Sequence, residues 1–434
     1  MSVDNVQLVI MAGGKGSRLS SLSKDIPKPM INIADKPVLE HQLKFFVENG
    51  FQDAIISIGY LGHVIKDYFK DGTSFGLTIN YIEETKPLGT AGALRFVDTT
   101  ADLLLLVNGD IIFDFDLNRM LAYHKSKNAD ITLFTHPNNH PQDSAIIETD
   151  DEGRIIKWFN KEKRRENVPN RVNAGIHLIN RAALNFNSAI WQKDKVDLDR
   201  DILKPNISTT RIFAYDSPEY VKDMGTPERY FQVNADFKSG IITQRNLKCP
   251  QRAIFLDRDG TLNRHIGFLN NAAQLELLEG VTSAIKLINQ SPYLAIVASN
   301  QPVIARGECT FEEMRRIHNR LEMLLGMEGA YLDDITFCPH HTDSGFAGEI
   351  KALKIDCDCR KPKPGMLLNM AKKYNIDLSK SYMIGDDSRD IKAGLAAGCH
   401  AVYIGDKNYP LSSKVCRAAN LLEAVQLILQ GENP

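Results

Sequence analysis

The sequence predicts an α/β protein built from more than one domain. Its 434 residues exceed what one ordinary hydrophobic core supports, so two or three domains are expected. Strand-length apolar runs alternate with helical patterns, which is typical of mainly parallel sheets. Two of these runs, at 6–12 and 253–256, lead into polar motifs suited to chemistry at the carboxyl ends of strands.

The composition is typical of a soluble globular protein. Hydrophobic residues make up 43% of the chain and charged residues 24%, and the net charge is only −2. Without a basic tract to follow a nucleic-acid backbone, we expect small anionic substrates and no nucleic acid. The first residues lack the features of a signal peptide, and the apolar runs are only strand length, so we predict a cytoplasmic protein that does not span a membrane.

The first domain opens with a strand over 6–12 and a glycine-rich loop over 13–19. Glycines let the backbone approach phosphates and present amide donors, and Lys15 and Arg18 add positive charge. By itself the loop also fits an ordinary turn, since its spacing matches neither a P-loop nor the dinucleotide fingerprint. Lys28 favours phosphate binding, because it lies between two prolines in a rigid extended segment.

The strand and helix pattern continues beyond this loop. Residues 38–50 have helical apolar spacing with a glycine stop, and 54–58 form a second strand. Residues 83–95 predict another helix with glycines at its start, where a base or ribose would lie, although alone they fit a plain glycine-containing helix start. The strand that begins at 103 ends near Asp110, whose carboxylate would hold magnesium against a triphosphate.

Together, the motifs over 6–235 resemble the sugar-nucleotidyltransferase family, which joins a nucleoside triphosphate to a sugar 1-phosphate. The resemblance implies a Rossmann-like domain with a mixed sheet. It also implies in-line attack on the α-phosphorus, with charge neutralisation and no covalent protein intermediate. The residues that would surround the nucleotide phosphates are Gly13, Gly14, Lys15, Gly16, Arg18 and Lys28, of which Arg18 and Lys28 are the predicted catalytic cations.

The same resemblance assigns the base, the sugar and a second metal ligand. Gly89 and its neighbours would meet the base, and Lys161 the sugar phosphate, although Asn160 stands where the family usually has glutamate. The strand that begins at 172 would bind the sugar through Asn173 and Gly175. Asp223 would join Asp110 in binding magnesium.

The second domain begins with the apolar strand 253–256, which ends at Asp257 and Asp259 followed by Gly-Thr. One carboxylate can attack a phosphoryl group while the other protonates the leaving oxygen, with a divalent metal neutralising the charge. A plain polar turn is the alternative. The later carboxylate Asp386, at the end of another strand, favours the catalytic interpretation.

These residues resemble the haloacid-dehalogenase (HAD) phosphohydrolase superfamily, whose first motif is Asp-x-Asp-x-Thr. The resemblance implies that Asp257 is the nucleophile, that Asp259 is the general acid and then base, and that both bind magnesium with Asp386. The residues that would bind phosphate oxygens or stabilise the transition state are Ser299, Asn300, Gln301, Arg360 and Lys361. Because 259–299 holds only about one βαβ passage, we expect a HAD-like Rossmannoid domain without a large cap.

Three of the seven cysteines are bunched between Cys338 and Cys359, which favours a metal site over a disulfide framework. Cys338-Pro-His340-His341 and Cys357-Asp-Cys359 supply two pairs of soft and imidazole ligands, as a closed tetrahedral zinc site requires. The alternative is a set of unrelated buried thiols. Either histidine fits by residue type, and the Cys-x-His pattern of related enzymes favours His340. We predict a structural zinc loop.

The zinc loop narrows the resemblance to heptose bisphosphate phosphatases and histidinol-phosphate phosphatases, and residues 300–307 and 357–366 are closer to the heptose enzymes. Pro302 and Val303 depart from their usual Ser-Gly. The two halves then fit consecutive steps. The resemblance implies that heptose 1,7-bisphosphate would lose its 7-phosphate, and that heptose 1-phosphate would then receive a guanylyl group, for which we expect GTP.

Two alternatives remain open. One is a mannose or glucose 1-phosphate nucleotidyltransferase fused to a histidinol-phosphate-type phosphatase. The other is a regulatory scaffold with decayed sites, which the presence of all the predicted catalytic residues disfavours. We predict a transferase domain over 1–240, a linker over 241–250 and a phosphatase domain over 251–434. The sequence does not predict an oligomeric state.

Overall fold

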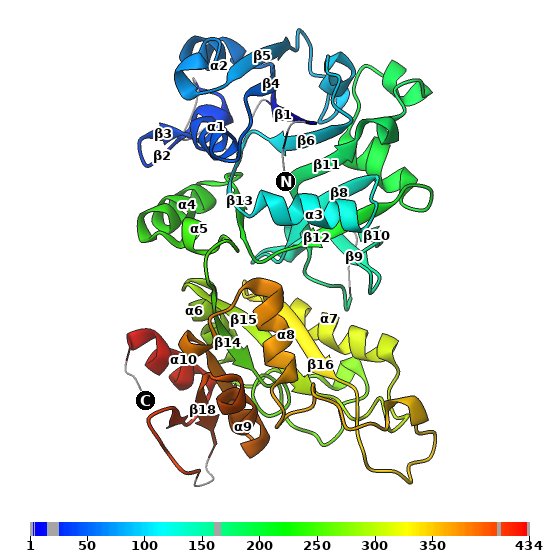
Figure 1. The fold of residues 1–434 in the computed structure, drawn as a ribbon, viewed down its shortest axis with the longest axis vertical. Helices are drawn as coiled ribbons and strands as arrows, with labels where there is room; N and C mark the ends of the chain where they lie inside the picture. The colour runs from blue at the N-terminus through cyan, green and yellow to red at the C-terminus, as the bar shows by residue number, and fades with distance from the viewer. Residues whose placement is uncertain (1–2, 4, 15–25, 160–165, 406–408, 432–434) are drawn as a thin grey trace. The chain divides into compact units, whose positions relative to one another are not determined.

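The computed structural model describes residues 1–434 apart from 1–2, 4, 15–25, 160–165, 406–408 and 432–434. The described chain forms two compact units (Figure 1). The first contains 1–136, 147–158 and 173–246, and the second contains 137–146, 159–172 and 247–434. Two segments of the amino-terminal half thus belong to the second unit, where Arg171 forms an ion pair of 2.9 Å with Glu322.

The larger sheet of the amino-terminal half is mixed, as predicted. Its main path has the order β10-β9-β11-β6-β1-β4-β5, and β8 and β12 extend it from β11. Strands β1, β4, β5 and β6 run parallel, whereas β11 is antiparallel to β6. The bounds are β1 (Val6–Ala12), β4 (Asp53–Ile58), β5 (Thr78–Glu83), β6 (Leu103–Asn108), β8 (Ile131–His136), β9 (Ile146–Thr149), β10 (Ile155–Phe159), β11 (Val172–Asn180) and β12 (Ile212–Asp216).

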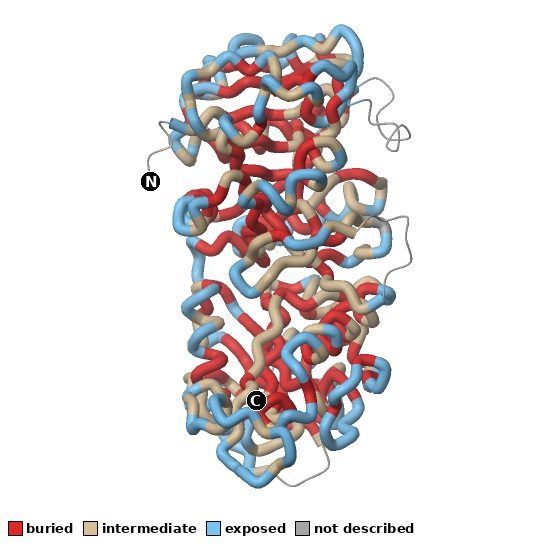
Figure 2. Tube along the Cα trace, turned by 90° about the vertical axis from the view of Figure 1, so that its right-hand side faces the viewer, coloured by how far each residue is buried: buried red, intermediate tan, exposed pale blue. Residues whose placement is uncertain are grey.

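Alternate residues of these strands enter two different cores. Leu8 and Ile10 of β1 pack with the apolar faces of α1, α2 and α3, whereas Val9 packs in a second core with Leu94 and Trp191. The sheet is therefore covered on both faces, and Figure 2 shows its strands as largely buried. The helices of this half are α1 (Val38–Glu48), α2 (Gly62–Phe69), α3 (Leu117–Ser126), α4 (Pro227–Ser239) and α5 (Ile241–Gln244), the last within the predicted linker.

Short elements complete the first half. Two small antiparallel pairs join β2 (Asn32–Ile33) to β3 (Lys36–Pro37) and β7 (Ile111–Asp114) to β13 (Tyr220–Asp223). The short helices are η2 (Lys28–Met30), η3 (Thr73–Phe75), η4 (Gly92–Phe96), η5 (Pro141–Asp143), η6 (Arg181–Leu184), η7 (Ala189–Gln192), η8 (Leu198–Leu203) and η9 (Lys204–Asn206).

The helix expected within 83–95 is wrong in type, because only the 3-10 helix η4 forms there. The backbone just before η4 forms hydrogen bonds with a distant segment of the chain. The Ala91 N–H donates to the Val196 carbonyl, and the Val196 N–H donates to the Leu88 carbonyl. Gly89 has φ +88°, and a Cβ there would lie 2.4 Å from the Val196 oxygen, so only glycine fits this approach.

The second unit contains a parallel sheet with the order β16-β15-β14-β17-β18-β19 among its described residues. Because β14 lies between β15 and β17 in this order, its carboxyl end lies between the carboxyl ends of those two strands. The strands are β14 (Arg252–Leu256), β15 (Tyr293–Asn300), β16 (Asp334–Cys338), β17 (Tyr382–Gly385), β18 (His400–Ile404) and β19 (Val415–Ala418).

Helices cover both faces of this sheet, which gives three layers. Ile254 and Leu256 pack in one core with residues of α6, α7 and α10, and Ala253 and Phe255 pack in another with residues of α8. Between Asp259 and Ser299 the structure describes only η10 and α6 as helices, in line with the predicted lack of a large cap. The helices are α6 (Val281–Asn289), α7 (Phe311–Met327), α8 (Gly365–Tyr374), α9 (Ser388–Ala397), α10 (Leu421–Gln430), η10 (Ala272–Gln274), η11 (Lys351–Leu353) and η12 (Leu378–Lys380).

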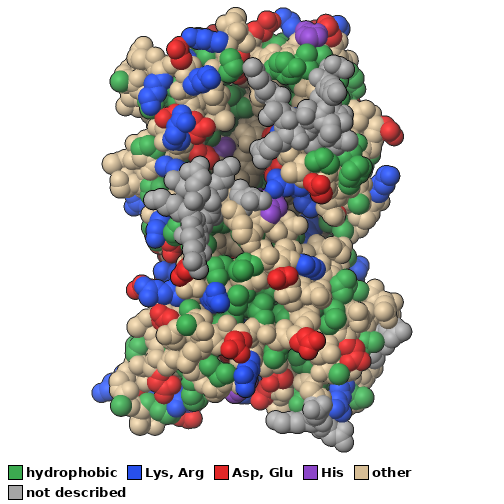
Figure 3. Space-filling model, turned by 180° about the vertical axis from the view of Figure 1, so that it is seen from behind, with side chains coloured by type: hydrophobic (Ala, Val, Ile, Leu, Met, Phe, Trp, Pro, Cys, Tyr) green, Lys and Arg blue, Asp and Glu red, His purple; other side chains and the backbone are tan. Residues whose placement is uncertain are grey.

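Charged side chains of both signs are interspersed on the face shown in Figure 3, as the small net charge predicts. No helix among the described residues has both the length and the apolar character that crossing a bilayer requires.

Candidate active sites

A buried lysine lies among carboxylates at the carboxyl end of β14. The Lys361 Nζ atom lies 2.7 Å from Asp257 Oδ1 and 2.7 Å from Asp390 Oδ1, and it donates to the Ala298 carbonyl at 2.7 Å. Burial lowers the pKa of Lys361, but the charges of the two carboxylates outweigh it, so the net pKa is raised. Lys361 is therefore a fixed cation beside the predicted nucleophile.

Asp257, Asp386 and Asp390 form a cluster in which one oxygen from each lies within 4.8 Å of the others. Burial raises the pKa of Asp390 to about 7, with the charge of Asp257 adding to the effect, and burial also raises the pKa of Asp386. Three carboxyl groups thus surround the one buried lysine. Their hard oxygen donors fit a magnesium ion.

Gly260 allows this cluster to close. It has φ +93°, and a Cβ there would lie 2.2 Å from Asp386 Oδ2. The following helix then begins with a capping box, in which the Asp387 side chain accepts from the Asp390 N–H and the Asp390 side chain accepts from the Asp387 N–H. This cap orients Asp390 toward Lys361.

Asp259 is held by the fully buried Arg258. The Arg258 guanidinium lies 2.8 Å from Asp259 Oδ2 and also donates to Gln301 Oε1 at 3.0 Å. Burial raises the pKa of Asp259, but the charge of Arg258 and hydrogen bonds from Asn263, Gln301 and Arg258 outweigh it, so the net pKa is lowered. Asp259 is therefore ionised in this arrangement, the form that accepts a proton.

The end of β15 supplies amide and hydroxyl groups to the same site. Gln301 Nε2 lies 2.7 Å from Ser299 Oγ and 2.8 Å from Asp259 Oδ2. Asn300 exchanges two hydrogen bonds of 3.0 Å with the backbone of Lys361. These groups surround a cavity of about 150 Å³, whose lining includes Asp257, Asp259, Ser299, Arg360, Lys361 and Asp386.

Three cysteines and one histidine meet at the end of β16. The Sγ atoms of Cys338, Cys357 and Cys359 lie 3.2–3.5 Å apart, and His340 Nδ1 lies 3.3 Å from Cys359 Sγ and 3.6 Å from Cys338 Sγ. A tetrahedral zinc ion with Zn–S bonds of about 2.3 Å sets its ligand atoms about 3.5–3.8 Å apart. His341 lies outside this group, and its Nδ1 accepts from the Asp343 N–H.

In the amino-terminal half, Lys28 and Asp110 lie at neighbouring positions. The Lys28 Nζ atom is 3.2 Å from Asp110 Oδ2, and both residues are partly buried. Asp223 ends β13, which pairs with β7 so that Asp223 lies opposite Ile111. The Met224 N–H donates to the Asp110 carbonyl, so the two predicted metal ligands lie on adjacent backbones. Arg229 lies 2.7 Å from both carboxylate oxygens of Asp223.

The predicted sugar-binding strand begins beside a second acidic group. Asn173 accepts from the Gly175 N–H and donates to Asp199 at 3.3 Å. Burial raises the pKa of Asp199 to about 6, and the charge of Asp197 adds to the effect. Gly175 has φ +80°, and a Cβ there would lie 2.4 Å from Asn108 Nδ2. Glycine is therefore required at 175.

Comparison with known families identifies the amino-terminal half. The family model described as Nucleotidyl transferase matches residues 7–240. The chain belongs to this family. A second model, described as HAD-hydrolase-like, matches residues 358–410.

Three curated relatives match the two halves separately. In the first half, a mannose-1-phosphate guanylyltransferase of Mycobacterium tuberculosis is 32% identical over 56% of this chain and 67% of its own. A D-glycero-alpha-D-manno-heptose 1-phosphate guanylyltransferase of Aneurinibacillus thermoaerophilus is 32% identical over 54% of this chain and 99% of its own. A D-glycero-beta-D-manno-heptose-1,7-bisphosphate 7-phosphatase of Pasteurella multocida is 37% identical over 40% of this chain and 93% of its own. The chain is a bifunctional enzyme that joins a nucleotidyl transferase to a HAD-type phosphatase.

All eight predicted residues of the phosphatase active site line one cavity in the structure. In the nucleotidyl transferase half, the predicted residues Lys15, Gly16, Arg18 and Lys161 lie outside the described residues. Three residues that contact predicted site residues were not predicted from the sequence, namely Arg258, Asp390 and Asp199. Asp390 lies in the first turn of α9, four residues after Asp386, and its nearness to that predicted carboxylate was a signal in the sequence. Arg258 and Asp199 carried none beyond their charge.

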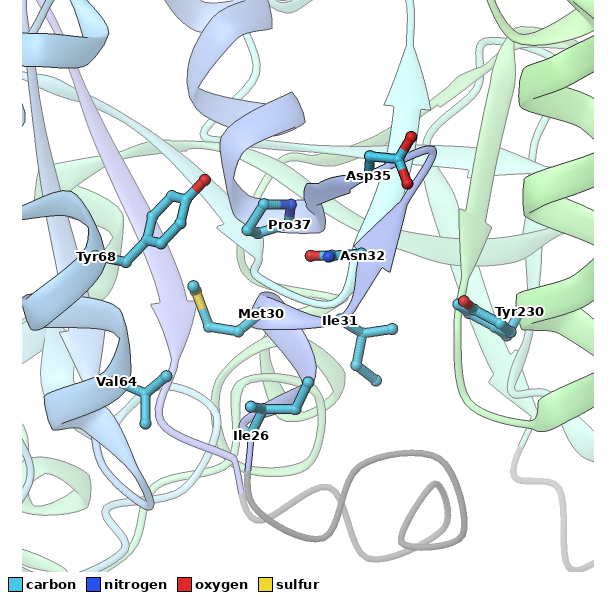
Figure 4. Close-up of a pocket in the computed structure, with 9 residues that line it drawn as sticks. All are labelled: Ile26, Met30, Ile31, Asn32, Asp35, Pro37, Val64, Tyr68 and Tyr230. Carbon is cyan, nitrogen blue, oxygen red and sulfur yellow. The ribbon is translucent and has the colours of Figure 1, made fainter.

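A separate cavity of about 430 Å³ lies in the nucleotidyl transferase half, beside the short helix that carries Lys28 (Figure 4). Its wall is mostly apolar, with Asn32 and the hairpin residue Asp35 as polar members. The remaining lining residues are Ile26, Met30, Ile31, Pro37, Val64, Tyr68 and Tyr230. None of them is a predicted nucleotide or sugar contact, and we assign no ligand to this cavity.

Proposed function

We propose that the protein activates a heptose in two consecutive steps. The phosphatase removes the 7-phosphate of D-glycero-D-manno-heptose 1,7-bisphosphate, and the transferase joins GMP from GTP to the resulting heptose 1-phosphate, with release of pyrophosphate. The observation that carries the proposal is the union, in one chain, of halves related to enzymes that are named for these two substrates.

The phosphatase site supports a double displacement. A carboxylate oxygen of Asp257 forms a bond to phosphorus as the bond to the sugar C7 oxygen breaks, and Asp259 gives its proton to that oxygen. Asp259 then takes a proton from water, whose oxygen attacks phosphorus and releases phosphate from Asp257. Lys361 balances the charge on the transferring group from its position 2.7 Å from Asp257.

Asp259 must be protonated for the first half-reaction, although Arg258 lowers its pKa. A substrate phosphate entering beside Asp259 opposes this effect, because its negative charge favours the protonated carboxyl. Asp257, Asp259 and Asp386, which line one cavity, would hold a magnesium ion. When bound, that ion would neutralise charge on the phosphate oxygens.

The transferase site supports a direct displacement. An oxygen of the sugar 1-phosphate attacks the α-phosphorus of GTP in line, and pyrophosphate leaves. Lys28, with Arg18, would stabilise the developing charge, and the glycine loop at 13–16 would hold the phosphates. Asp110 and Asp223 would hold magnesium, since Asp223 lies opposite Ile111 and the next residue, Met224, donates to the Asp110 carbonyl. GTP is favoured as the nucleotide substrate because the two curated relatives described above for this half are both guanylyltransferases.

A structural zinc ion is proposed for Cys338, His340, Cys357 and Cys359, whose ligand atoms are close enough to share one ion. It would close the loop between the two ligand pairs and fix the start of the segment that carries Arg360 and Lys361.

The configuration at C1 of the heptose must be the same in both steps. The phosphatase relative is named for the beta anomer and the guanylyltransferase relative for the alpha anomer. Since C1 is untouched by removal of the 7-phosphate, consecutive action requires one anomer to serve both sites. We propose the alpha anomer, which the transferase relative uses.

Phosphorus NMR of the full chain with magnesium, GTP and each anomer of the bisphosphate tests the proposal. We expect loss of the 7-phosphate followed by pyrophosphate and a GDP-sugar diester signal, faster with the alpha anomer. Phosphate release without a diester would reject the transferase assignment. Because one relative uses mannose 1-phosphate, that sugar is the competing substrate, and its preferential use would replace the heptose in the second step.

A further inference from the structure

An arginine of the phosphatase lies between two phenylalanine rings. The Arg306 Cζ atom is 4.0 Å from the ring centroid of Phe268 and 4.0 Å from that of Phe346. The Arg306 side chain is only 16% exposed, and its Nε lies 3.1 Å from Glu308 Oε1. Such a partly desolvated stack is among the stronger cation–π arrangements.

The two rings come from different loops. Phe268 belongs to the segment 265–269, which lines the phosphatase cavity through His265, Gly267, Phe268 and Leu269. Phe346 belongs to the loop between the two ligand pairs of the cysteine and histidine cluster. With Arg306 stacked on its ring, Phe268 still has 47% of its surface exposed, so packing covers only part of this side chain.

The turn that carries Arg306 is firmly anchored. Its neighbours Ile304 and Ala305 are fully buried in the core. The Ile350 N–H of the cluster loop donates to the Ala305 carbonyl at 3.0 Å. Gly307 has φ +74°, and a Cβ there would lie 2.0 Å from the Gly348 oxygen, so the two backbones touch. The turn therefore connects the cluster loop to the cavity wall.

A second cation, Lys354, also contacts the Phe346 ring. The Lys354 Nζ atom is 4.6 Å from the centroid of this ring, and Lys354 pairs with Glu349 at 3.3 Å. Glu349 accepts in turn from the Phe346 N–H. The ring of Phe346 is thus a fixed support against which Arg306 rests.

We propose that Arg306 is a positioning residue that holds Phe268 at the cavity wall by clamping it, through Phe346, to the cluster loop. The clamp then shapes the part of the cavity that receives the sugar moiety, and not the part that receives the reacting phosphate. This inference rests on the phosphatase function proposed above. It predicts that the clamp matters for a sugar bisphosphate and not for a small aryl phosphate.

The test compares Arg306→Met and Phe346→Leu with matched controls on the same unit. Arg316→Met and Phe311→Leu replace an exposed arginine and an exposed phenylalanine of α7, neither of which lines the cavity. For heptose 1,7-bisphosphate, we expect Arg306→Met to raise KM about tenfold with little change in kcat. For p-nitrophenyl phosphate, we expect no change in kcat/KM, and the controls should match wild type with both substrates.

Hydrogen–deuterium exchange provides a readout that does not depend on activity. Arg306→Met and Phe346→Leu should both speed exchange in the 265–269 segment, and the controls should not. Equal losses with both substrates, or unchanged exchange at 265–269, would overturn the clamp. By contrast, a wild-type protein that hydrolyses no phosphate ester would reject the phosphatase proposal, while exchange at 265–269 would still decide the clamp.

Discussion

The ammonium group of Lys361 and the carboxylate of Asp257 lie 2.7 Å apart, although 104 residues separate them along the chain. Asp390 lies at the same distance from Lys361 on another side. The cation is therefore held between two acids, only one of which is a predicted nucleophile. The second acid fixes where the lysine can be when phosphate arrives.

Removing that second acid should impair the phosphatase alone. Asp390→Asn leaves Lys361 with one charged partner, so we expect phosphatase kcat/KM to fall by about 10- to 100-fold. Transferase activity should stay within about twofold of wild type. Asp356→Asn, which alters an exposed ion pair with Lys363, is the control. Undiminished hydrolysis by Asp390→Asn would mean that Asp390 does not position the lysine.

The two active sites should be separable by single substitutions. Asp257→Asn removes the nucleophile and should lower phosphatase activity about a thousandfold or more, whereas Lys28→Met should lower guanylyl transfer about a hundredfold. Each variant should retain the other activity, measured as phosphate release and as pyrophosphate release. Arg18→Ala should behave as Lys28→Met does. If every variant kept both activities, the site assignments would be wrong.

The cysteine and histidine cluster should bind one zinc ion per chain. Cys359→Ser removes one of four ligands, so we expect loss of most zinc by mass spectrometry and an unfolding temperature lower by at least about 3 °C. Cys249→Ser, at an exposed cysteine, should change neither quantity. A full complement of zinc in Cys359→Ser would place the ion elsewhere.

Burial of His177 should make stability depend on pH. Burial lowers the pKa of His177 to about 4, below its ordinary value of 6.5. Between these values the unfolded chain binds a proton that the folded chain does not, so the free energy of unfolding falls as pH falls through this range. The full contribution is present above about pH 6.5, and by pH 5 about 2 kcal/mol of it is lost.

His177→Gln provides the comparison, since the glutamine side chain does not titrate. The difference in unfolding free energy between wild type and this variant should shrink by about 2 kcal/mol between pH 7.5 and pH 5, measured by urea unfolding of both proteins. Other buried histidines contribute equally to both proteins and cancel. A difference that does not vary with pH would show that His177 does not cause the effect.

The strand ends were predictable because they depend on local patterns. The chain before Asp257 and the chain before Asp386 each form a strand, as predicted. Because these strands, β14 and β17, are neighbours in the sheet, the two aspartates meet at the same edge. The four residues of the cysteine and histidine cluster could also be grouped in advance, since their residue types and pairing limit the choices. The prediction of a helix within 83–95 was wrong in type, because Val196, from a distant segment, forms backbone hydrogen bonds with Leu88 and Ala91.

By itself, the sequence determined the α/β class, the two families and the order of the motifs, since short-range periodicity and residue type carry that information. Only the tertiary structure decided that Arg258 holds Asp259, that Asp390 shares Lys361, and that Arg306 lies between Phe268 and Phe346. Each of these contacts depends on how separate loops meet in space. No local pattern encodes a stack or an ion pair whose partners are set by the packing of a whole sheet.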